Sequence, residues 1–427
     1  MMEGWKDYKI EDIADVVGGG TPSSNIDDYW NGDISWITPN DLSGYPFKTI
    51  KKGSRNISNL GLQKSSAKLH PENTVLLTSR APIGYLAIAK KEVATKQGFQ
   101  SLRCKSDVVD YNFIYYYLSL FRNAIASIAS GATFPEVSGK KLKQFKIVLP
   151  SLPTQRRIAS ILSAYDDLIE NNLKRIELLE EMAQNYFDNW YSNNTDYEET
   201  NLGAFIGHEI GGGWGEEEQT GEFIKPAFVI RGTDIDELPN GKNEKVPFRY
   251  HKKSNLASRK LQDGDIIFEV SGGSSYEGVA KTLLVTEELL NQFNSPVMPA
   301  SFCKLVRPAE RKHSCFIFHF FRFLRKLKGT EVFEIRSASN IVNYNWTAFL
   351  KFQKVKKPLG DQLTELNTIV EPIYKQIYNL GKQNQLLKEA RDILLPRLMT
   401  GMIDVSEINT ELSMAAEDGV EYEKEKN

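Results

Sequence analysis

The feature that most constrains the fold of this 427-residue chain is an internal repeat that spans most of its sequence. Segments of the first half return in the second half, in the same order, at an offset of about 190 to 210 residues. This offset is far too long for a solenoid, whose repeats span roughly 20 to 50 residues. The sequence therefore predicts two tandem copies of a whole domain. The matched pairs are Gly18–Gly20 with Gly211–Gly213, Ser35–Leu42 with Val229–Ile235, Glu72–Leu77 with Asp263–Phe268, and Phe113–Phe121 with Phe316–Leu327.

The charge of the chain follows the same repeat. Residues 1–150, 151–200, 201–358 and 359–427 carry net charges of +5, −6, +5 and −6, so two basic blocks alternate with two acidic blocks. Within each basic block, short β-type runs alternate with Gly, Pro and Asn turns and one or two helical patterns. This alternation is typical of a compact α+β domain.

A long amphipathic helix follows each basic block. Its apolar residues recur in steps of four and three, which is the 3.5-residue period of a helix that buries one seam against a partner helix. Helices that follow equivalent domains of a duplicated chain can pair antiparallel. An Asn in the seam is interpreted as a register device. The seam residues are Ile158, Leu162, Tyr165, Ile169, Asn172, Ile176, Leu179, Ala183, Tyr186 and Trp190 in the first copy, and Leu363, Leu366, Val370, Ile373, Ile377, Leu380, Asn384, Leu387, Arg391 and Leu394 in the second.

The predicted fold class is α+β, with two globular domains joined by two long antiparallel coiled-coil helices in a pseudo-two-fold arrangement. We expect globular domains over residues 1–150 and 196–358, helices over 151–195 and 359–405, and a disordered acidic tail over 406–427. In the second helix, Asp361 can cap the start and Pro396 ends it. Pro372 lies inside this helix and predicts a kink or a broken first turn.

The sequence lacks the common signatures of an active site. It has no Walker A loop, no [DN]PP[YF] methyltransferase motif, no GxGxxG in a βαβ context and no HExxH. Ser79 and Ser274 lack the GxSxG context of a nucleophile. The three cysteines and five histidines form no metal-binding spacing. No stretch is long and apolar enough for a membrane span, and no signal peptide is evident, so we expect a cytoplasmic binding protein.

Basic residues in both halves indicate nucleic acid as the ligand. Lysine and arginine fix a protein on DNA phosphates, whereas polar loop residues can read base edges. The alternative is that each basic cluster is only a solvated surface. The phosphate-contact candidates are Lys51, Lys52, Arg55, Lys140, Lys141, Lys252, Lys253, Arg259 and Lys260, and the base-reading candidates are Ser79, Arg80, Ser274, Ser275 and Tyr276.

Several segments resemble those of type I restriction–modification specificity (S) subunits. The resemblance covers nearly the whole chain, to about residue 405, and it depends on the order, spacing and duplication of the motifs rather than on one of them. The matching segments are Gly19–Ser23, Tyr29–Ile37, Gln97–Gln100, Leu149–Ile158 at the first long helix, and Leu394–Val405 at the end of the second. The second copy departs from this pattern at Gly213–Glu216 and Ser271–Tyr276, which puts its individual contacts in doubt.

The resemblance implies a non-catalytic subunit that recognises a bipartite double-stranded DNA target. Each globular domain would be a target-recognition domain for one half of the target. The helices would hold the half-sites about one helical turn apart, roughly 34 Å, and dock two methyltransferase (M) subunits. S-adenosylmethionine would bind to those subunits, whereas ATP and Mg²⁺ would bind to a restriction (R) subunit where one is present. This chain itself would hold no cofactor and no metal. The alternatives are a stand-alone nuclease and a coiled-coil scaffold without DNA specificity.

Overall fold

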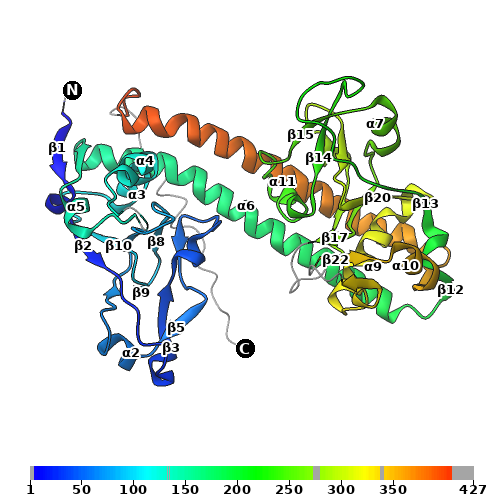
Figure 1. Cartoon of the computed structure of the whole chain (residues 1–427), viewed down its shortest axis with the longest axis horizontal. Coiled ribbons are helices and arrows are strands. Elements are labelled where there is room, and N and C mark those ends of the chain that lie inside the picture. Colours follow the sequence, from blue (N-terminus) through cyan, green and yellow to red (C-terminus); the bar gives the residue numbers. More distant parts are fainter. Residues whose placement is uncertain (1–3, 132, 134, 273–278, 337–340, 406–427) are drawn as a thin grey trace, which may run out of the picture. The chain divides into compact units, whose positions relative to one another are not determined.

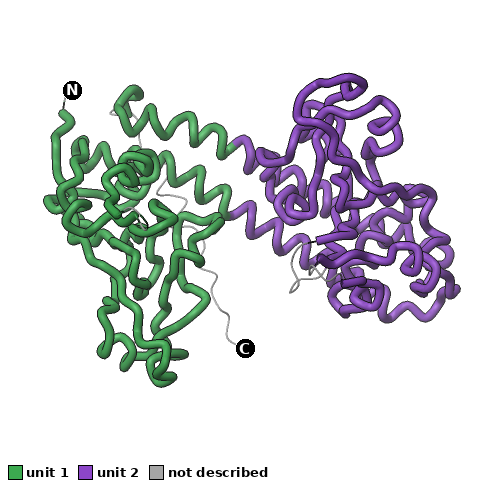
Figure 2. Tube along the Cα trace, in the orientation of Figure 1, with its two compact units in different colours: residues 1–170, 387–427 green, residues 171–386 purple. Residues whose placement is uncertain are grey.

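The computed structural model describes residues 4–131, 133, 135–272, 279–336 and 341–405. The predicted tail, residues 406–427, lies outside the described residues, as do Ser274, Ser275 and Tyr276. The chain divides into two compact units (Figures 1 and 2). Unit 1 comprises residues 1–170 and 387–427, and unit 2 comprises residues 171–386. Each unit therefore contains one globular domain together with parts of both long helices.

Unit 1 is built on two mixed sheets. The first has the strand order β2 (Ala14–Gly18), β10 (Gln100–Cys104), β7 (Val75–Leu77), β8 (Leu86–Ala89) and β4 (Thr49–Ile50). The second has the order β5 (Arg55–Ile57), β3 (Trp30–Ile37), β9 (Val93–Thr95) and β6 (Leu69–His70). A separate pair joins β1 (Lys6–Lys9) to β11 (Lys146–Leu149). The helices are α1 (Ile10–Ile13), α2 (Asn59–Gln63), α3 (Tyr111–Leu120), α4 (Arg122–Ser127) and α5 (Gly139–Lys143), with 3-10 turns at Asp27–Tyr29 and Pro39–Leu42.

Unit 2 repeats this arrangement and adds a third sheet. Its first sheet has the order β13 (Ile206–Gly211), β20 (Cys303–Pro308), β16 (Ile266–Glu269) and β18 (Thr282–Leu284). Its second has the order β15 (Phe248–His251), β14 (Lys225–Ile230) and β19 (Val297–Pro299). The added sheet is β17 (Ser271–Gly272), β22 (Val342–Tyr344) and β21 (Glu334–Arg336), and a separate pair joins β12 (Tyr197–Asn201) to β23 (Lys354–Pro358). The helices are α7 (Lys253–Arg259), α8 (Glu287–Leu290), α9 (Ser314–Lys326) and α10 (Trp346–Phe352), with 3-10 turns at Leu202–Phe205, Gly232–Asp234, Leu238–Asn240, Arg311–His313 and Glu331–Phe333.

Equivalent backbone hydrogen bonds confirm that the fold is duplicated. In unit 1 the amides of Gly19 and Gly20 donate to the carbonyls of Phe99 and Thr95, at 3.3 and 2.9 Å. In unit 2 the amides of Gly212 and Gly213 donate to Cys303 and Pro299, at 2.9 and 3.0 Å. A Cβ atom on Gly19 would lie 2.1 Å from the carbonyl oxygen of Lys96, and a Cβ atom on Gly212 would lie 2.1 Å from that of Ala300. Neither position therefore has room for a side chain. The repeated glycines are therefore required by packing.

The two predicted long helices are present as α6 (Leu152–Asn193) and α11 (Gln362–Met399). Within unit 1, Ile158 and Leu162 of α6 share a buried cluster with Leu398 of α11, and further along α6 Asp166 forms an ion pair with Arg391 at 2.5 Å. Residue numbers rise along one helix as they fall along the other, so the helices are antiparallel there. Within unit 2, the side chain of Asn194, just past the end of α6, donates to Gln362 at the start of α11, at 3.0 Å.

The predicted seam residues are buried or half-buried without exception. The buried face of α6 is nevertheless wider than one seam, because the globular domain of unit 2 packs on it as well. Phe187 and Tyr191 lie outside the seam, and their rings lie 5.9 and 6.2 Å from that of Phe316 in α9. The heptad pattern therefore describes only one of the two buried stripes on this part of α6.

The proline expectations for α11 are partly wrong. The helix runs through Pro372 without a broken turn, and it ends at Met399 rather than at Pro396. Pro372 cannot donate a hydrogen bond to the carbonyl of Thr368, but both residues are exposed. Water can therefore satisfy that carbonyl, and the helix continues.

Candidate nucleic-acid interface

The predicted base-reading loop of unit 1 follows strand β7. The loop is held by two neighbouring segments, because the amide of Ser79 donates to the carbonyl of Gly98 at 2.7 Å and the carbonyl of Ser79 accepts from the amide of Val137 at 2.9 Å. Residues 78–84, 96–98, 130 and 136–137 therefore meet just beyond the end of strand β7, and we call this end of the first sheet its loop edge. The sequence located the first segment but gave no signal that residue 136 joins it.

Ser79 itself does not fit the predicted role. Its exposed fraction is 0%, and its hydroxyl is buried without a hydrogen-bond partner among the described atoms. The backbone of Ser79 is paired on both sides, and this pairing directs its side chain into the core. The assignment of base reading to Ser79 is therefore wrong.

Arg80 faces outward beside this buried residue. Its guanidinium forms an ion pair with Glu136 at 3.0 Å, and the side chains of Arg80 and Glu136 are 45% and 34% exposed. The exposed Lys96 and Gln97 lie in the adjoining turn, before Gly98 with its positive φ of +102°. An arginine whose orientation is fixed by a carboxylate can donate two parallel hydrogen bonds to a guanine edge or to a phosphate. Glu136 and Gln97 are candidates that the sequence prediction missed.

The predicted phosphate contacts of unit 1 lie at different places in the unit. Lys140 is exposed at the start of α5, whereas the ammonium group of Lys141 donates to the carbonyl of Ile128 at 2.8 Å. Lys51 and Lys52 are exposed after β4. The guanidinium of Arg55 lies 3.7 Å from the centre of the Trp30 ring, and this cation–π contact holds it in one orientation.

The turn that precedes Arg55 is braced by a carboxylate. Asp41 accepts hydrogen bonds from the amide of Thr38 at 2.7 Å and from the amide of Ser54 at 2.8 Å. Burial raises the pKa of Asp41, but these hydrogen bonds outweigh burial and hold the pKa below its usual value. The turn stays braced at neutral pH because Asp41 remains ionised.

Unit 2 uses the same backbone framework with different side chains. The amide of Val270 donates to the carbonyl of Phe302 at 2.9 Å, and the amide of Tyr344 donates to the carbonyl of Val270 at 2.9 Å. Val270 therefore corresponds to Ser79, and the bridged pair Ser271 and Asn343 corresponds to Arg80 and Glu136. Asn343 is exposed, and an asparagine can make two hydrogen bonds to adenine.

An exposed aromatic ring accompanies Asn343 in unit 2. Phe302 is 66% exposed at the position that corresponds to Gly98. Equivalent edges of the two units therefore offer different chemistry, with an ion pair in one and an amide beside an aromatic ring in the other.

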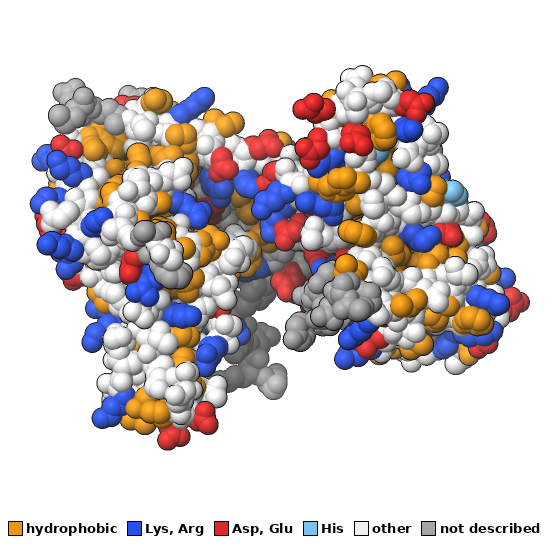
Figure 3. All heavy atoms as spheres, in the orientation of Figure 1, with side chains coloured by type: hydrophobic (Ala, Val, Ile, Leu, Met, Phe, Trp, Pro, Cys, Tyr) orange, Lys and Arg blue, Asp and Glu red, His pale blue; other side chains and the backbone are white. Residues whose placement is uncertain are grey.

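Two of the four predicted phosphate contacts of unit 2 are engaged within the protein. Lys252 pairs with Glu222 at 2.7 Å. Arg259 donates to the carbonyl of Gly211 at 2.8 Å and to the side chain of Asn255 at 2.6 Å. Lys253 and Lys260 are exposed in and after α7. Figure 3 shows lysine and arginine side chains scattered among acidic and neutral ones on the visible face of each unit rather than gathered in one patch.

The three cysteines are free thiols, of which Cys303 and Cys315 are buried. Burial raises the pKa of Cys104 and of Cys315 to about 12, and it raises that of Cys303 as well, so the thiols stay protonated at neutral pH. Among the residues that the structure describes, no three His, Cys, Asp or Glu side chains are placed to hold a metal ion. No helix within the described ranges is long and apolar enough to cross a membrane.

Comparisons with known proteins point to one family. A family model described as the type I restriction modification DNA specificity domain matches residues 2–181. The chain is 34% identical to the type I restriction enzyme MjaIX specificity subunit of Methanocaldococcus jannaschii, over 95% of this chain and 94% of that protein. It is 30% identical to the EcoR124I/EcoR124II specificity subunit of Escherichia coli, over 44% of this chain and 49% of that protein.

A solved structure shares the fold. The crystal structure of a type I restriction-modification system S subunit from M. genitalium matches with a TM-score of 0.55 and 16% sequence identity, over 92% of this chain and 96% of that chain. The likeness extends across both units.

Proposed function

Because the chain belongs to the family of type I restriction–modification specificity subunits, we propose that it recognises a bipartite DNA target and reads one half-site with each unit. Recognition of a DNA target is the function of this family. The bipartite reading rests on the duplication, since a chain that contains two equivalent edges can contact two stretches of one duplex. The chain would contribute recognition and positioning, and the chemistry would belong to partner subunits.

One observation carries this proposal. The loops at residues 79 and 270 share their backbone hydrogen bonds, but their exposed side chains differ. Backbone identity with side-chain divergence is expected when two domains keep one docking geometry and read different bases. Arg80 would donate to guanine, and Asn343 would pair with adenine.

The test is to map methylated adenines in cells that carry this chain with its methyltransferase. Arg80→Ala should relax the base preference at one half-site by about 1 to 3 kcal/mol and leave the other half unchanged. Asn343→Ala should do the reverse. Ser79→Ala is the matched control, because this neighbouring side chain is buried and should not touch DNA. Methylation patterns that stay the same in both variants would refute the assignment.

The partners and cofactors extend the proposal. Two methyltransferase subunits would bind the long helices and carry S-adenosylmethionine for adenine methylation. A restriction subunit, where present, would carry ATP and Mg²⁺. Support comes from apolar side chains on the outer faces of α6 and α11, of which Leu178 and Met182 are 63% and 51% exposed. Exposed apolar residues one helical turn apart form a surface suited to another protein.

A stand-alone nuclease or a scaffold without DNA specificity has no observation in its favour. Incubation of the purified chain with duplex DNA and Mg²⁺ tests the first alternative. A nuclease would cleave the DNA, and we expect no cleavage. A salt titration of duplex binding tests the second alternative. We expect affinity that falls steeply with salt, because a protein that contacts DNA phosphates releases their counterions.

A further inference from the structure

A cavity of about 560 Å³ lies in unit 2 among α6, α9, α11, β18 and β21. Its volume falls within the range of ligand-binding pockets, about 300 to 1,000 Å³. Strand β21 belongs to the added sheet, in which Arg336 pairs with Val342, the neighbour of Asn343. The cavity therefore borders the proposed base-reading edge of unit 2.

The lining of this cavity has an excess of positive charge. Its described cations are Lys281, Arg322, Arg325, Lys326, Lys328 and Arg336, and its described carboxylates are Glu180, Asp236, Glu331 and Glu334. Each of these carboxylates pairs with a cation other than Arg325, through Arg322–Glu180 at 3.7 Å, Lys281–Asp236 at 2.6 Å, Lys328–Glu331 at 4.0 Å and Arg336–Glu334 at 3.9 Å.

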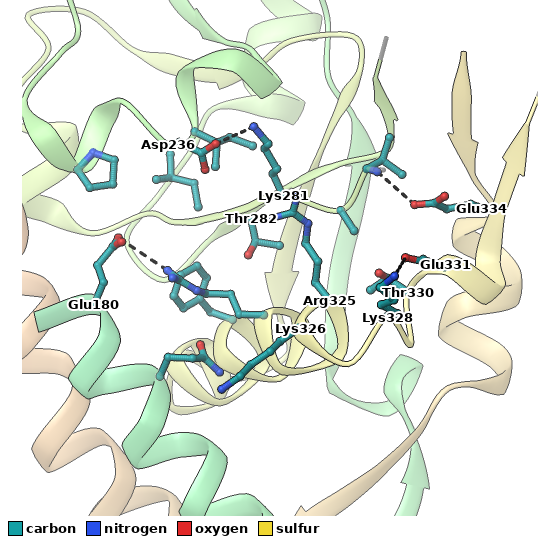
Figure 4. A pocket seen from close by; sticks show the side chains of 18 of the residues that line it. Glu180, Asp236, Lys281, Thr282, Arg325, Lys326, Lys328, Thr330, Glu331 and Glu334 are labelled. Atoms are coloured by element: carbon teal, nitrogen blue, oxygen red, sulfur yellow. Dashed lines mark hydrogen bonds and ion pairs between the residues drawn. The ribbon is translucent and has the colours of Figure 1, made fainter. Parts of the chain in front are cut away.

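The side chain of Arg325 forms no hydrogen bond and no ion pair with any described residue, and burial raises the pKa of the nearby Glu269 more than the charge of Arg325 lowers it. Figure 4 shows its side chain reaching from α9 into the cavity, toward Lys281. A half-buried guanidinium carries five N–H donors, and its desolvation is compensated only when an acceptor is present. The geometry therefore leaves room for an acceptor that the described residues do not supply.

The equivalent arginine of unit 1 is engaged. Arg122 follows the first residue of α3 by 11 positions, as Arg325 follows the first residue of α9. Arg122 donates to the carbonyl of Ile83 at 3.2 Å, and its guanidinium lies 5.1 Å from the centre of the Tyr85 ring. It also covers Gly84, where an added Cβ atom would lie 2.5 Å from its Cγ.

The difference between the two arginines has a cause in the sequence. Equal strand pairing of β8 and β18 makes Ala280 the counterpart of Gly84 and Lys281 the counterpart of Tyr85. Both turn residues have a positive φ, +90° for Gly84 and +70° for Ala280, so the backbone path is kept. The methyl group of Ala280 would clash with an arginine in the position that Arg122 takes. Lys281 would also repel an arginine there, whereas the ring of Tyr85 attracts Arg122. The side chain of Arg325 therefore cannot make the contacts that engage Arg122.

We infer that this cavity binds a phosphodiester group of the DNA backbone, next to the bases read at Asn343, with Arg325 as its main contact and Arg322 beside it. The inference rests on the proposed DNA recognition. Arginine suits such a group because its planar fork donates two hydrogen bonds to two phosphate oxygens. Unit 1 would lack this contact, so the two half-sites would be held differently.

The test measures the binding of the full chain to a fluorescent duplex over a range of salt concentrations. Arg325→Gln should lower the slope of log K against log[salt] by about 0.9, the value of one phosphate contact. It should also weaken binding by about tenfold. Arg325→Lys keeps the charge and should keep the slope. Arg122→Gln is the matched control and should bind with the slope of the unaltered chain, and thermal melting checks that each variant is folded.

The outcomes separate the inference from the proposed function. A slope that Arg325→Gln leaves unchanged, in a chain that otherwise binds DNA, overturns the phosphate site and leaves DNA recognition intact. If the same variant instead loses a co-purifying protein subunit, the occupant is an acidic protein surface, and the inference is wrong. An unaltered chain without salt-dependent duplex binding overturns both.

Discussion

At the scale of single residues, His70 is a buried imidazole with one unused nitrogen. Its exposed fraction is 0%, its Nε2 atom lies 3.1 Å from the hydroxyl of Thr95, and its Nδ1 atom has no partner among the described atoms. Burial, with the nearby charge of Arg103, holds the pKa of His70 at about 4. Protonation of His70 therefore opposes folding.

The stability of unit 1 should depend on pH through this residue. An unfolded histidine has a pKa of about 6.5, so between pH 6.5 and 4 the unfolded state binds more protons than the folded one. Stability is complete above that interval and falls by up to about 3 kcal/mol as the pH is lowered through it. His70→Gln should remove this loss. Hydrogen exchange of β6 and β9 at pH 7 and pH 4.5 measures it, and equal pH dependence in both proteins would contradict the prediction.

The sequence predicted where the candidate site lies along the chain, but it did not predict which way the side chains of the site point. A polar loop between two β-type runs placed Arg80 at an exposed edge, and the structure keeps it there. Ser79 has the same composition signal but points inward, because its backbone is fixed by a hydrogen bond to the carbonyl of Gly98 and another from the amide of Val137. Neither partner is close to it in sequence. For the same reason Glu136 and Asn343 could not be found, since only the fold brings them to the loops.

At the scale of elements, the α11 seam contains an unfavourable residue. Asn384 is 4% exposed, and neither polar atom of its side chain has a hydrogen-bond partner among the described atoms. A buried polar group without a partner costs about 1 to 3 kcal/mol. Such a residue is retained in coiled coils where it fixes the register of the helices.

Asn384→Leu should therefore stabilise unit 2 by about 2 kcal/mol, because it replaces the unpartnered amide with an apolar group of similar size. Gln383→Leu is the control, since this neighbour is exposed and should change stability by less than about 0.5 kcal/mol. The free energy of unfolding from a urea titration, followed by the helical signal, gives the comparison. A decrease for Asn384→Leu would show that the amide has a partner in solution.

The period of the helices was readable from the sequence, but the full buried face was not. The seam from Ile158 to Trp190 repeats locally, so the sequence alone exposes it. Phe187 and Tyr191 are buried because α9 packs on α6, which is a contact between distant segments. The interruption expected at Pro372 failed for a similar reason, since the cost of a missing hydrogen bond depends on whether water reaches the carbonyl.

At the scale of the whole molecule, the duplication was the most predictable property. Matching glycines and strands were sufficient to indicate two α+β domains, and the repeated sheets confirm this. The added sheet of unit 2 was not predicted, because β17, β21 and β22 are two or three residues long and carry no clear alternation.

The proposed assembly with methyltransferase subunits predicts a defect in complex formation. A double change of Leu178 and Met182 to Glu places charge on the exposed apolar face of α6 and should abolish co-purification of the methyltransferase subunits. Phe352→Glu is the control, because Phe352 is similarly exposed, at 62%, but belongs to α10 and not to either long helix. Size-exclusion chromatography of the co-expressed subunits reports the result. An intact complex from the double variant would place the partner elsewhere.

Unit 1 is assembled from both ends of the described chain, and this has a consequence for the order in which the domains fold during translation. Leu398, Met399 and Val405 from the end of the chain share a buried cluster with Ile10 and Phe113 from its beginning. The first domain to be translated therefore lacks part of its core until residues 398–405 are synthesised. Unit 2 is a single continuous segment, residues 171–386, so its synthesis is complete before that of unit 1. The domain synthesised second can thus fold first, and premature termination near the end of the message would leave the earlier domain incomplete.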